Sequence, residues 1–261
     1  MSNRLSVLLV LASAALGACH DWTQYDPRLG TSTGTSTSTG TGTGSSGGAG
    51  GSGGAPVDCE VDDNVGGGGS GAIGACSPLI ADDFSSSLGQ WGDVKGDVKV
   101  ANGALVLNLP TIAVDIAQTR SNVLFNFTDC RSFVKLSKAP DTTSKGLAIL
   151  SLQASPTDYY TLLETNGRLE AKGQVTGKEL STPPPTIPYN PTDHRYLGIR
   201  KRGDTVCWQT SPDGKKWTTM AVSKKELPSS MLRIVLGAVT YDTIEAVPPG
   251  ETQFDDVNIA P

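Results

Sequence analysis

The spacing of apolar runs from residue 79 to the C-terminus limits the possible folds more than any other feature of this sequence. Short runs of alternating or continuous apolar residues recur there, separated by Gly, Pro, Asn or Asp. Breaks about every eight to twelve positions are typical of antiparallel strands joined by tight turns. No segment keeps a helical period. The spacing predicts an all-β domain over residues 79–261, built as a two-sheet antiparallel β-sandwich.

The strands expected from these runs are too many for a single sheet, which favours two packed sheets. The turns Asn166-Gly167, Arg202-Gly203-Asp204 and Pro212-Asp213-Gly214 each separate two runs as hairpin loops do. One helical turn is expected over 224–230. The expected strands are 103–109, 112–118, 123–127, 131–136, 146–154, 159–164, 168–173, 195–202, 205–210, 216–222, 232–241 and 252–259.

The N-terminus has the features of an export signal. Arg4 precedes an apolar run over 5–16, which is too short to span a membrane. The run ends in Leu16-Gly17-Ala18-Cys19, which resembles the bacterial lipobox. The resemblance implies a signal peptide over residues 1–18, a lipid on Cys19, membrane attachment and a place in the cell envelope. The residue after Cys19 is not Asp, which favours the outer membrane. The alternative is an ordinary signal peptide.

A stalk and linker are expected over residues 19–78. Residues 31–54 contain only Gly, Ser, Thr and Ala, so they cannot offset the entropy of ordering. We expect a flexible, disordered tether with a root-mean-square span of roughly 25 to 30 Å.

The cysteines indicate disulfides, because an exported chain meets an oxidising compartment. Besides Cys19 the chain has Cys59, Cys76, Cys130 and Cys207, which allow three pairings. Cys59 and Cys76 are near in sequence and lie outside the strand-rich region, which favours a bond between them. Cys130 and Cys207 both lie within candidate strands, which favours the second bond. A metal site is the alternative, but CxxC and Cys/His spacings are missing.

The residues of the expected sandwich resemble a known superfamily. Asp82-Asp83-Phe84 with Trp91, the stretch 196–217 with its Ser-x-Asp-Gly-x-x-Trp turn, and Phe254-Asp255-Asp256-Val257 are similar to segments of concanavalin-A-like lectin/glucanase domains. The closest likeness is to laminin-G-like jelly rolls. The resemblance covers residues 79–261 and implies the fold, but it says little about a ligand.

The sequence lacks a recognisable catalytic motif. Within residues 79–261 His194 is the one histidine, GxSxG does not occur, and neither does the ExDxxE pattern of glucanases. Glu164 and Glu170 flank a turn, and we expect solvated charges there. The sequence therefore predicts a protein that is not an enzyme, and the alternative is a glycoside-active enzyme of the same superfamily.

Three groups of residues are candidates for binding. Two acidic pairs near the ends of the domain are candidates for a structural calcium ion, the only cofactor the sequence suggests. Aromatic residues on expected strands are candidates for stacking on sugar rings, and a basic cluster at the hairpin tips is a candidate for an acidic polysaccharide. The calcium candidates are Asp82, Asp83, Asp255 and Asp256; the aromatic candidates are Tyr159, Tyr160, Tyr196 and Trp208; the basic cluster is Arg200, Lys201, Arg202, Lys215 and Lys216.

Charge argues against one class of partner. The net charge is −5, which gives no basic field for nucleic acid. We therefore expect a monomeric, lipid-anchored binding module with carbohydrate as its leading ligand. A structural or protein-interaction domain is the further alternative.

Overall fold

The structure is a computed structural model that describes Cys59, Cys76 and residues 80–109, 116–141, 146–180, 186–224, 227, 231–240 and 250–259. The signal peptide, the lipid on Cys19, the stalk and most of the helical turn expected over 224–230 lie outside the described residues.

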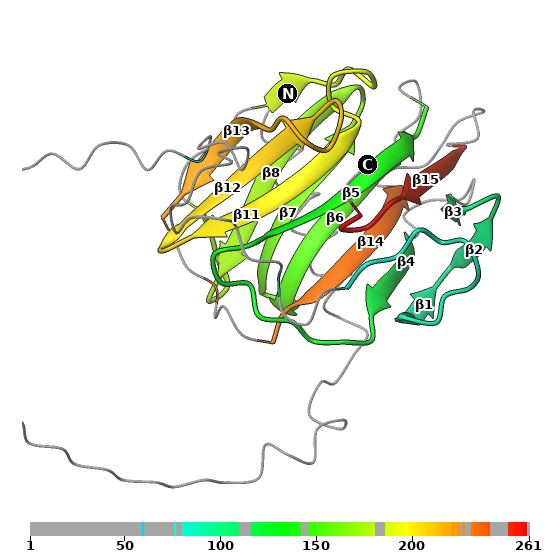
Figure 1. The fold of residues 1–261 in the computed structure, drawn as a ribbon, viewed down its shortest axis with the longest axis horizontal. Helices are drawn as coiled ribbons and strands as arrows, with labels where there is room; N and C mark the ends of the chain where they lie inside the picture. Colours follow the sequence, from blue (N-terminus) through cyan, green and yellow to red (C-terminus); the bar gives the residue numbers. More distant parts are fainter. Residues whose placement is uncertain are drawn as a thin grey trace, which may run out of the picture.

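Two antiparallel sheets lie face to face (Figure 1), which confirms the predicted all-β sandwich. In the described part of the chain the regular structure is entirely β, and no helix there is long and apolar enough to cross a membrane. The strands are β1 (Trp91–Lys95), β2 (Asp97–Ala101), β3 (Ala104–Asn108), β4 (Ile116–Ser121), β5 (Arg131–Lys138), β6 (Gly146–Ser155), β7 (Asp158–Thr165), β8 (Arg168–Val175), β9 (Lys178–Glu179), β10 (Thr186–Pro188), β11 (Tyr196–Arg202), β12 (Thr205–Ser211), β13 (Thr218–Ser223), β14 (Arg233–Thr240) and β15 (Glu251–Asp255).

The order of the strands places distant segments side by side. The eight-stranded sheet runs β1-β4-β14-β6-β7-β8-β10, with β9 paired to β8. The seven-stranded sheet runs β13-β12-β11-β5-β15-β3-β2. The last strand, β15, therefore lies inside its sheet between β5 and β3, where it can pair on both sides.

Alternation of side chains explains why each sheet has one dry face. In β5, Ser132, Val134 and Leu136 are buried, and the residues between them are partly exposed. The buried face of each sheet packs on that of the other. Trp208 of β12 and Tyr160 of β7 meet in this core at a ring separation of 5.7 Å.

The beginning and end of the domain lie together. Asp82 forms an isolated bridge with Val257. Asp82 accepts hydrogen bonds from the backbone N–H of Phe84 (2.8 Å) and from Nε1 of Trp91 (2.9 Å). Phe84 takes a left-handed φ of 51° and is fully buried. The Asp-Asp-Phe motif therefore anchors this loop to the core.

The sequence missed the strands with few apolar residues. β1 is exposed along most of its length and shows no apolar run, and β2 is partly exposed and only five residues long. The short strands β9 and β10 were missed for the same reason. The strand expected over 123–127 is reduced to one bridge between Phe125 and Leu232.

All four cysteines form disulfides, but the predicted pairing is wrong. Cys59 bonds Cys207, and Cys76 bonds Cys130. Cys207 lies in β12 and Cys130 directly precedes β5, two strands of the seven-stranded sheet that are separated by β11. Each of the two bonds a linker cysteine. Proximity in sequence failed as a guide because the linker cysteines lie against the sheet.

We expect the replacement of Cys76 and Cys130 by Ser to lower the free energy of unfolding by about 2 to 4 kcal/mol, since the cross-link shortens the unfolded chain across 54 residues. Urea unfolding of the oxidised variant measures this loss. Reduction of the unaltered protein is the control and should give a loss at least as large, because it opens both bonds. An unchanged midpoint in the variant would show that this disulfide does not stabilise the domain.

Candidate functional site

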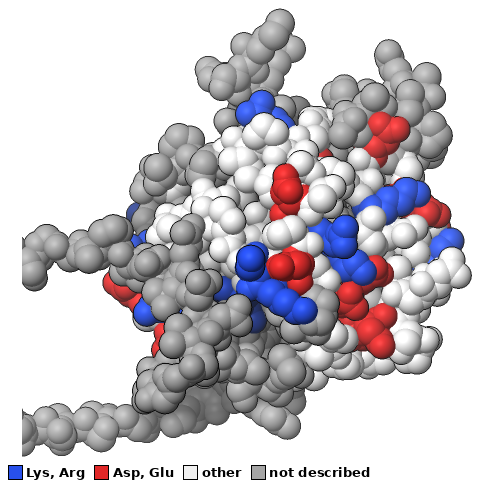
Figure 2. Space-filling view, turned by 45° about the horizontal axis from the view of Figure 1, so that its top comes forward, with Lys and Arg blue, Asp and Glu red and all other residues white. Residues whose placement is uncertain are grey.

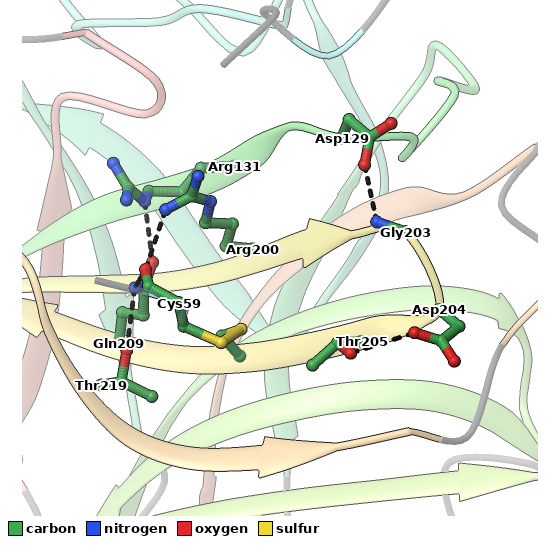
Figure 3. The surroundings of a disulfide bond; sticks show 10 residues. Cys59, Asp129, Arg131, Arg200, Gly203, Asp204, Thr205, Gln209 and Thr219 are labelled. Atoms are coloured by element: carbon green, nitrogen blue, oxygen red, sulfur yellow. Dashed lines mark hydrogen bonds between the residues drawn. A yellow bond between two sulfur atoms is a disulfide. The ribbon is translucent and has the colours of Figure 1, made fainter. Parts of the chain in front are cut away.

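The outer face of the seven-stranded sheet is covered by the linker at Cys59. The carbonyl oxygen of Cys59 accepts hydrogen bonds from Arg200 Nη1 (2.8 Å) and Gln209 Nε2 (3.0 Å), and its sulfur bonds Cys207 on the same face (Figure 3). Arg131 Nε donates to Gln209 at 3.0 Å. These side chains hold the linker, so this part of the sheet is already occupied.

The basic cluster predicted at the hairpin tips is not a single exposed patch. Arg200 and Lys201 are buried, and Arg200 contacts Cys59. The physical reason is that both residues lie within β11, inside the sheet. On the face shown in Figure 2, Lys and Arg side chains are interspersed with Asp and Glu. That face presents no large area of one sign.

The outer face of the eight-stranded sheet carries a line of polar side chains. Strand pairing places Arg120 of β4 opposite Val235, Val235 opposite Ser151 of β6, Ser151 opposite Thr161 of β7, and Thr161 opposite Lys172 of β8. We call Arg120, Ser151, Thr161 and Lys172 the polar row. Residues opposite each other in antiparallel strands point to the same face. The row crosses five strands, a length of about 19 Å at the usual strand spacing.

Three of the four residues of the polar row are shielded from water although they lie outside the core, and Lys172 is half-buried. Ser151 is 1% exposed, Thr161 7% and Arg120 8%. The hydroxyl oxygens of Ser151 and Thr161 are 2.8 Å apart, and Lys172 Nζ is 3.0 Å from a carboxylate oxygen of Glu170. Hydrogen bonds to a ligand are stronger in such partly dehydrated surroundings than in bulk water.

A second line of polar residues lies beside the polar row. Pairing aligns Arg233 of β14 with Gln153 of β6, Gln153 with Tyr159 of β7, and Tyr159 with Gln174 of β8. Gln153 Nε2 donates to Ser151 at 3.3 Å, which links the two lines. An arginine, two amides and a tyrosine add donors, acceptors and one aromatic ring to this face.

Only one of the four predicted ligand-binding aromatics lies on this face. Tyr159 is half-buried there. Tyr160 and Trp208 point into the core, where Trp208 Nε1 donates to the carbonyl of Thr161 and the Tyr160 hydroxyl accepts from the N–H of Leu227. Tyr196 is buried against Phe133 on the other sheet. Burial excludes these three from stacking on a ligand.

The two glutamates near the β7–β8 turn do not form a pair. Glu164 lies opposite Leu169, whereas Glu170 lies opposite Leu163, so successive positions send the two carboxylates to opposite faces. Glu170 lies on the outer face beside the polar row. The expectation that both are solvated is wrong for Glu164, which is 1% exposed.

Glu164 is a buried carboxyl with an altered acidity. Burial raises its pKa to about 7, and a hydrogen bond from the N–H of Gly167 at 2.8 Å partly opposes this. Its other oxygen, Oε2, has no hydrogen-bond partner among the described residues. Burial and the nearby Glu164 raise the pKa of Tyr189 to about 12. Glu164 therefore lies inside the sandwich, away from the outer-face row.

The four predicted calcium ligands have other partners. Asp82 holds Phe84 and Trp91, and Asp83 accepts the N–H of Ser85. Lys135 Nζ lies 3.1 Å from Asp255 and 3.3 Å from Asp256. Across the described residues, no group of three or more His, Cys, Asp or Glu side chains is placed to hold a metal ion.

The Ser211–Trp217 turn has the structural role that the sequence predicts. Asp213 Oδ1 accepts the N–H groups of Lys215 (2.9 Å) and Lys216 (2.8 Å), and these bonds lower the pKa of Asp213. Trp217 packs over Gly198, where an added Cβ would lie 2.6 Å from its ring. His194, just before β11, accepts the N–H of Asn190 on Nδ1.

Sequence reasoning missed most of the residues on the candidate face. Ser151, Thr161 and Gln153 are single polar positions inside apolar runs, whereas Arg120 lies in the polar stretch 118–122, and alternation alone does not tell which sheet they join. Their signal is a polar residue at every second position of β4 and β6. Pairing partners are needed to align them.

Comparison with solved structures agrees with the sandwich. The Crh5 transglycosylase in complex with NAG is 16% identical, with 70% of this chain and 82% of that chain covered and a TM-score of 0.51. A laminarinase from Flavobacterium sp. UMI-01 is 10% identical, with 69% and 98% covered and a TM-score of 0.51. LamA from Z. galactanivorans, in complex with laminaritriose and laminaritetraose, is 9% identical, with 72% and 98% covered and a TM-score of 0.51. No family model and no curated protein matches the chain.

These likenesses establish a jelly-roll fold of the concanavalin-like kind that glycoside-active enzymes share. They also contradict the prediction that the protein is not an enzyme. The structures with the same fold include a transglycosylase and a laminarinase, so the fold gives no ground for setting catalysis aside.

Replacing Glu164 by Gln should change how stability depends on pH. The carboxyl has an ordinary pKa of 4.5 and a folded value of about 7, so the unfolded chain ionises first as pH rises. The contribution of this carboxyl to the free energy of unfolding is therefore fully present below pH 4.5. It falls by up to about 3 kcal/mol as the pH rises from 4.5 to about 7. Urea unfolding at several pH values should show this fall in the unaltered protein and its loss in Glu164→Gln.

The exposed Glu179 provides the matched control, because Glu179→Gln removes an acid on β9 that is not buried. That variant should keep the fall in stability. If Glu164→Gln kept it as well, Glu164 would not be its cause.

Proposed function

We propose that this protein is a carbohydrate-active protein that holds a glycan chain along the outer face of its eight-stranded sheet. The observation that carries the proposal is the polar row, about 19 Å long, together with the half-buried Gln153, Tyr159 and Arg233 beside it. An extended chain of hydroxyl-rich rings needs a line of hydrogen-bonding groups of this kind. The fold shared with a transglycosylase and a laminarinase supports the same class of ligand.

The contacts assign parts of this face to different tasks. Ser151 and Thr161, held together at 2.8 Å, are buried and support the centre of the face, and the half-buried Lys172 lies beside Thr161. Tyr159 offers the edge or face of a ring for a sugar, and Gln153 offers an amide that already reaches Ser151. Part of the opposite face of the sandwich, at β11 and β12, is occupied by Cys59. The eight-stranded sheet therefore has the better surface for a ligand.

We place the protein in the bacterial cell envelope, attached through a lipid on Cys19. The lipobox-like Leu16-Gly17-Ala18-Cys19 and the apolar run before it support this part of the proposal. The low-complexity stretch over 31–54 is suited to a tether between lipid and sandwich. The laminin-G-like character of the sandwich belongs to the same proposal and rests on the sequence motifs alone.

Replacement of Tyr159 by Ala should weaken glycan binding by about tenfold, since it removes an aromatic contact and a hydroxyl. The full chain, purified in detergent, is titrated with laminarin and with xylan, and binding is followed by intrinsic fluorescence. Tyr189→Ala removes a tyrosine outside the polar row and serves as the matched control. Equal binding by the Tyr159 variant and the unaltered protein would place the ligand elsewhere.

Glycoside processing is the second candidate function, and Glu170 is the residue that favours it. Its carboxylate lies on the outer face next to the polar row and contacts Lys172 at 3.0 Å. Most glycosidases use two carboxyl groups about 5 to 10 Å apart. Along the polar row the next carboxylate among the described residues is Asp93, which pairs with Arg120 at the far end. A reaction here would need its second group from the substrate or from elsewhere in the chain.

Glu170→Gln should lower the release of reducing ends from laminarin at least about hundredfold while leaving binding within about twofold, if Glu170 takes part in proton transfer. Reducing-end assays and product sizing measure this, with Glu179→Gln as the control. Unchanged turnover in Glu170→Gln would remove Glu170 from the chemistry. Binding without turnover in the unaltered protein would remove laminarin as a substrate.

A further inference from the structure

The end of the polar row at β4 and β14 brings two arginines together. Arg120 of β4 lies opposite Val235 of β14. Arg233 is also in β14, two residues before Val235. The two side chains are therefore diagonal neighbours on one outer face. Arg120 is 8% exposed and Arg233 is half-buried, so both guanidinium groups lie close to the sheet.

One carboxylate holds Arg120 in place. Asp93 Oδ2 lies 3.0 Å from Arg120 Nη1, and the Asp93 side chain is 40% exposed. Asp93 has a left-handed φ of 50°, in the irregular part of β1 where the register with β4 shifts. The bent edge strand thus brings a carboxylate to the side of Arg120, and this contact orients the guanidinium along the face.

The two arginines repel each other in these surroundings. Burial lowers the pKa of Arg120, Asp93 opposes that change, and Arg233 adds to the lowering. A ligand that carries negative charge would relieve this repulsion. Arginine is also the side chain best suited to a carboxylate, because its planar donors match two oxygens at once.

Amides and hydroxyls surround the arginine pair. Gln118 precedes Arg120 by two residues on the same face of β4, and Gln153 lies opposite Arg233. Ser151 follows in the polar row, and Tyr159 lies beyond Gln153. A sugar bearing a carboxylate would find two guanidinium groups for its charge and neutral hydrogen-bonding groups for its hydroxyls, all on one sheet face.

We propose that the end of the polar row formed by Arg120 and Arg233 binds the carboxylate of a uronic-acid residue, so that the preferred ligand is an acidic polysaccharide. This inference rests on the proposed glycan-binding function of the same face. It differs from the hairpin-tip cluster suggested by the sequence, where Arg200 holds Cys59. The acidic ligand enters at the β4 and β14 side, and its neutral part follows the row toward β8.

The test compares polygalacturonate with its fully methyl-esterified form, which has the same sugar chain without the charge. The full chain in detergent is titrated with each polymer at low and at high salt. We expect the acidic polymer to bind about tenfold or more tightly than the ester, and this preference to shrink as salt rises.

Variants locate the site. Arg233→Gln should reduce the preference for the acidic polymer about tenfold and leave binding of the ester unchanged, and Arg233→Lys should restore part of it. Lys215→Gln, in the turn after β12, is the matched loss of charge and should have no effect. Arg120 pairs with Asp93 and is more deeply buried, so its replacement can also destabilise the fold. Binding by Arg120→Gln is therefore compared only after its urea unfolding curve shows that it is folded.

The outcomes separate the two proposals. Equal binding of both polymers, or a preference that Arg233→Gln leaves intact, would overturn the uronate site while the glycan-binding face stands. Binding of neither polymer, nor of laminarin or xylan, would overturn the proposed function together with this inference.

Discussion

The contact between Trp208 and Tyr160 is the interaction on which the arrangement of the two sheets depends. The rings come from different sheets and meet edge to face, 5.7 Å apart. Each also uses its polar atom: Trp208 donates to Thr161 on the opposite sheet, and Tyr160 accepts from Leu227. A buried aromatic pair with satisfied polar atoms fixes how one sheet lies over the other. The outer face beyond Tyr160, with Thr161 and Tyr159, is positioned by the same pair.

The sequence predicts the sandwich well where alternation is strong. Runs such as 146–154 and 205–210 became β6 and β12 with small changes of boundary, because their apolar positions are buried by the opposite sheet. Edge strands were missed because exposed strands carry few apolar residues, as in β1. The hairpin turn predicted from Asn166-Gly167 is present, and both residues take left-handed φ values, as a tight hairpin requires.

The site was harder to predict than the fold, because a strand has two faces and sequence alone does not say which is dry. Tyr159 and Tyr160 are neighbours, yet one faces outward and the other is part of the core. Trp208 was a candidate for stacking on a sugar ring and is an inter-sheet contact. The polar row depends on which strands pair, and β4, β14 and β6 are far apart in the sequence. Long-range pairing is the information that local patterns lack.

The Cys59–Cys207 bond decides where a mechanical pull on the N-terminal side of the chain enters the domain. Cys207 lies inside β12, which is hydrogen-bonded to β11 on one side and β13 on the other. Tension would therefore reach the interior of a sheet through a covalent bond. Without that bond, the load would fall on Cys76 and the loop held by the bridge between Asp82 and Val257. A force transmitted through the disulfide would therefore act on β12 inside its sheet and not on the edge strands β1 and β2.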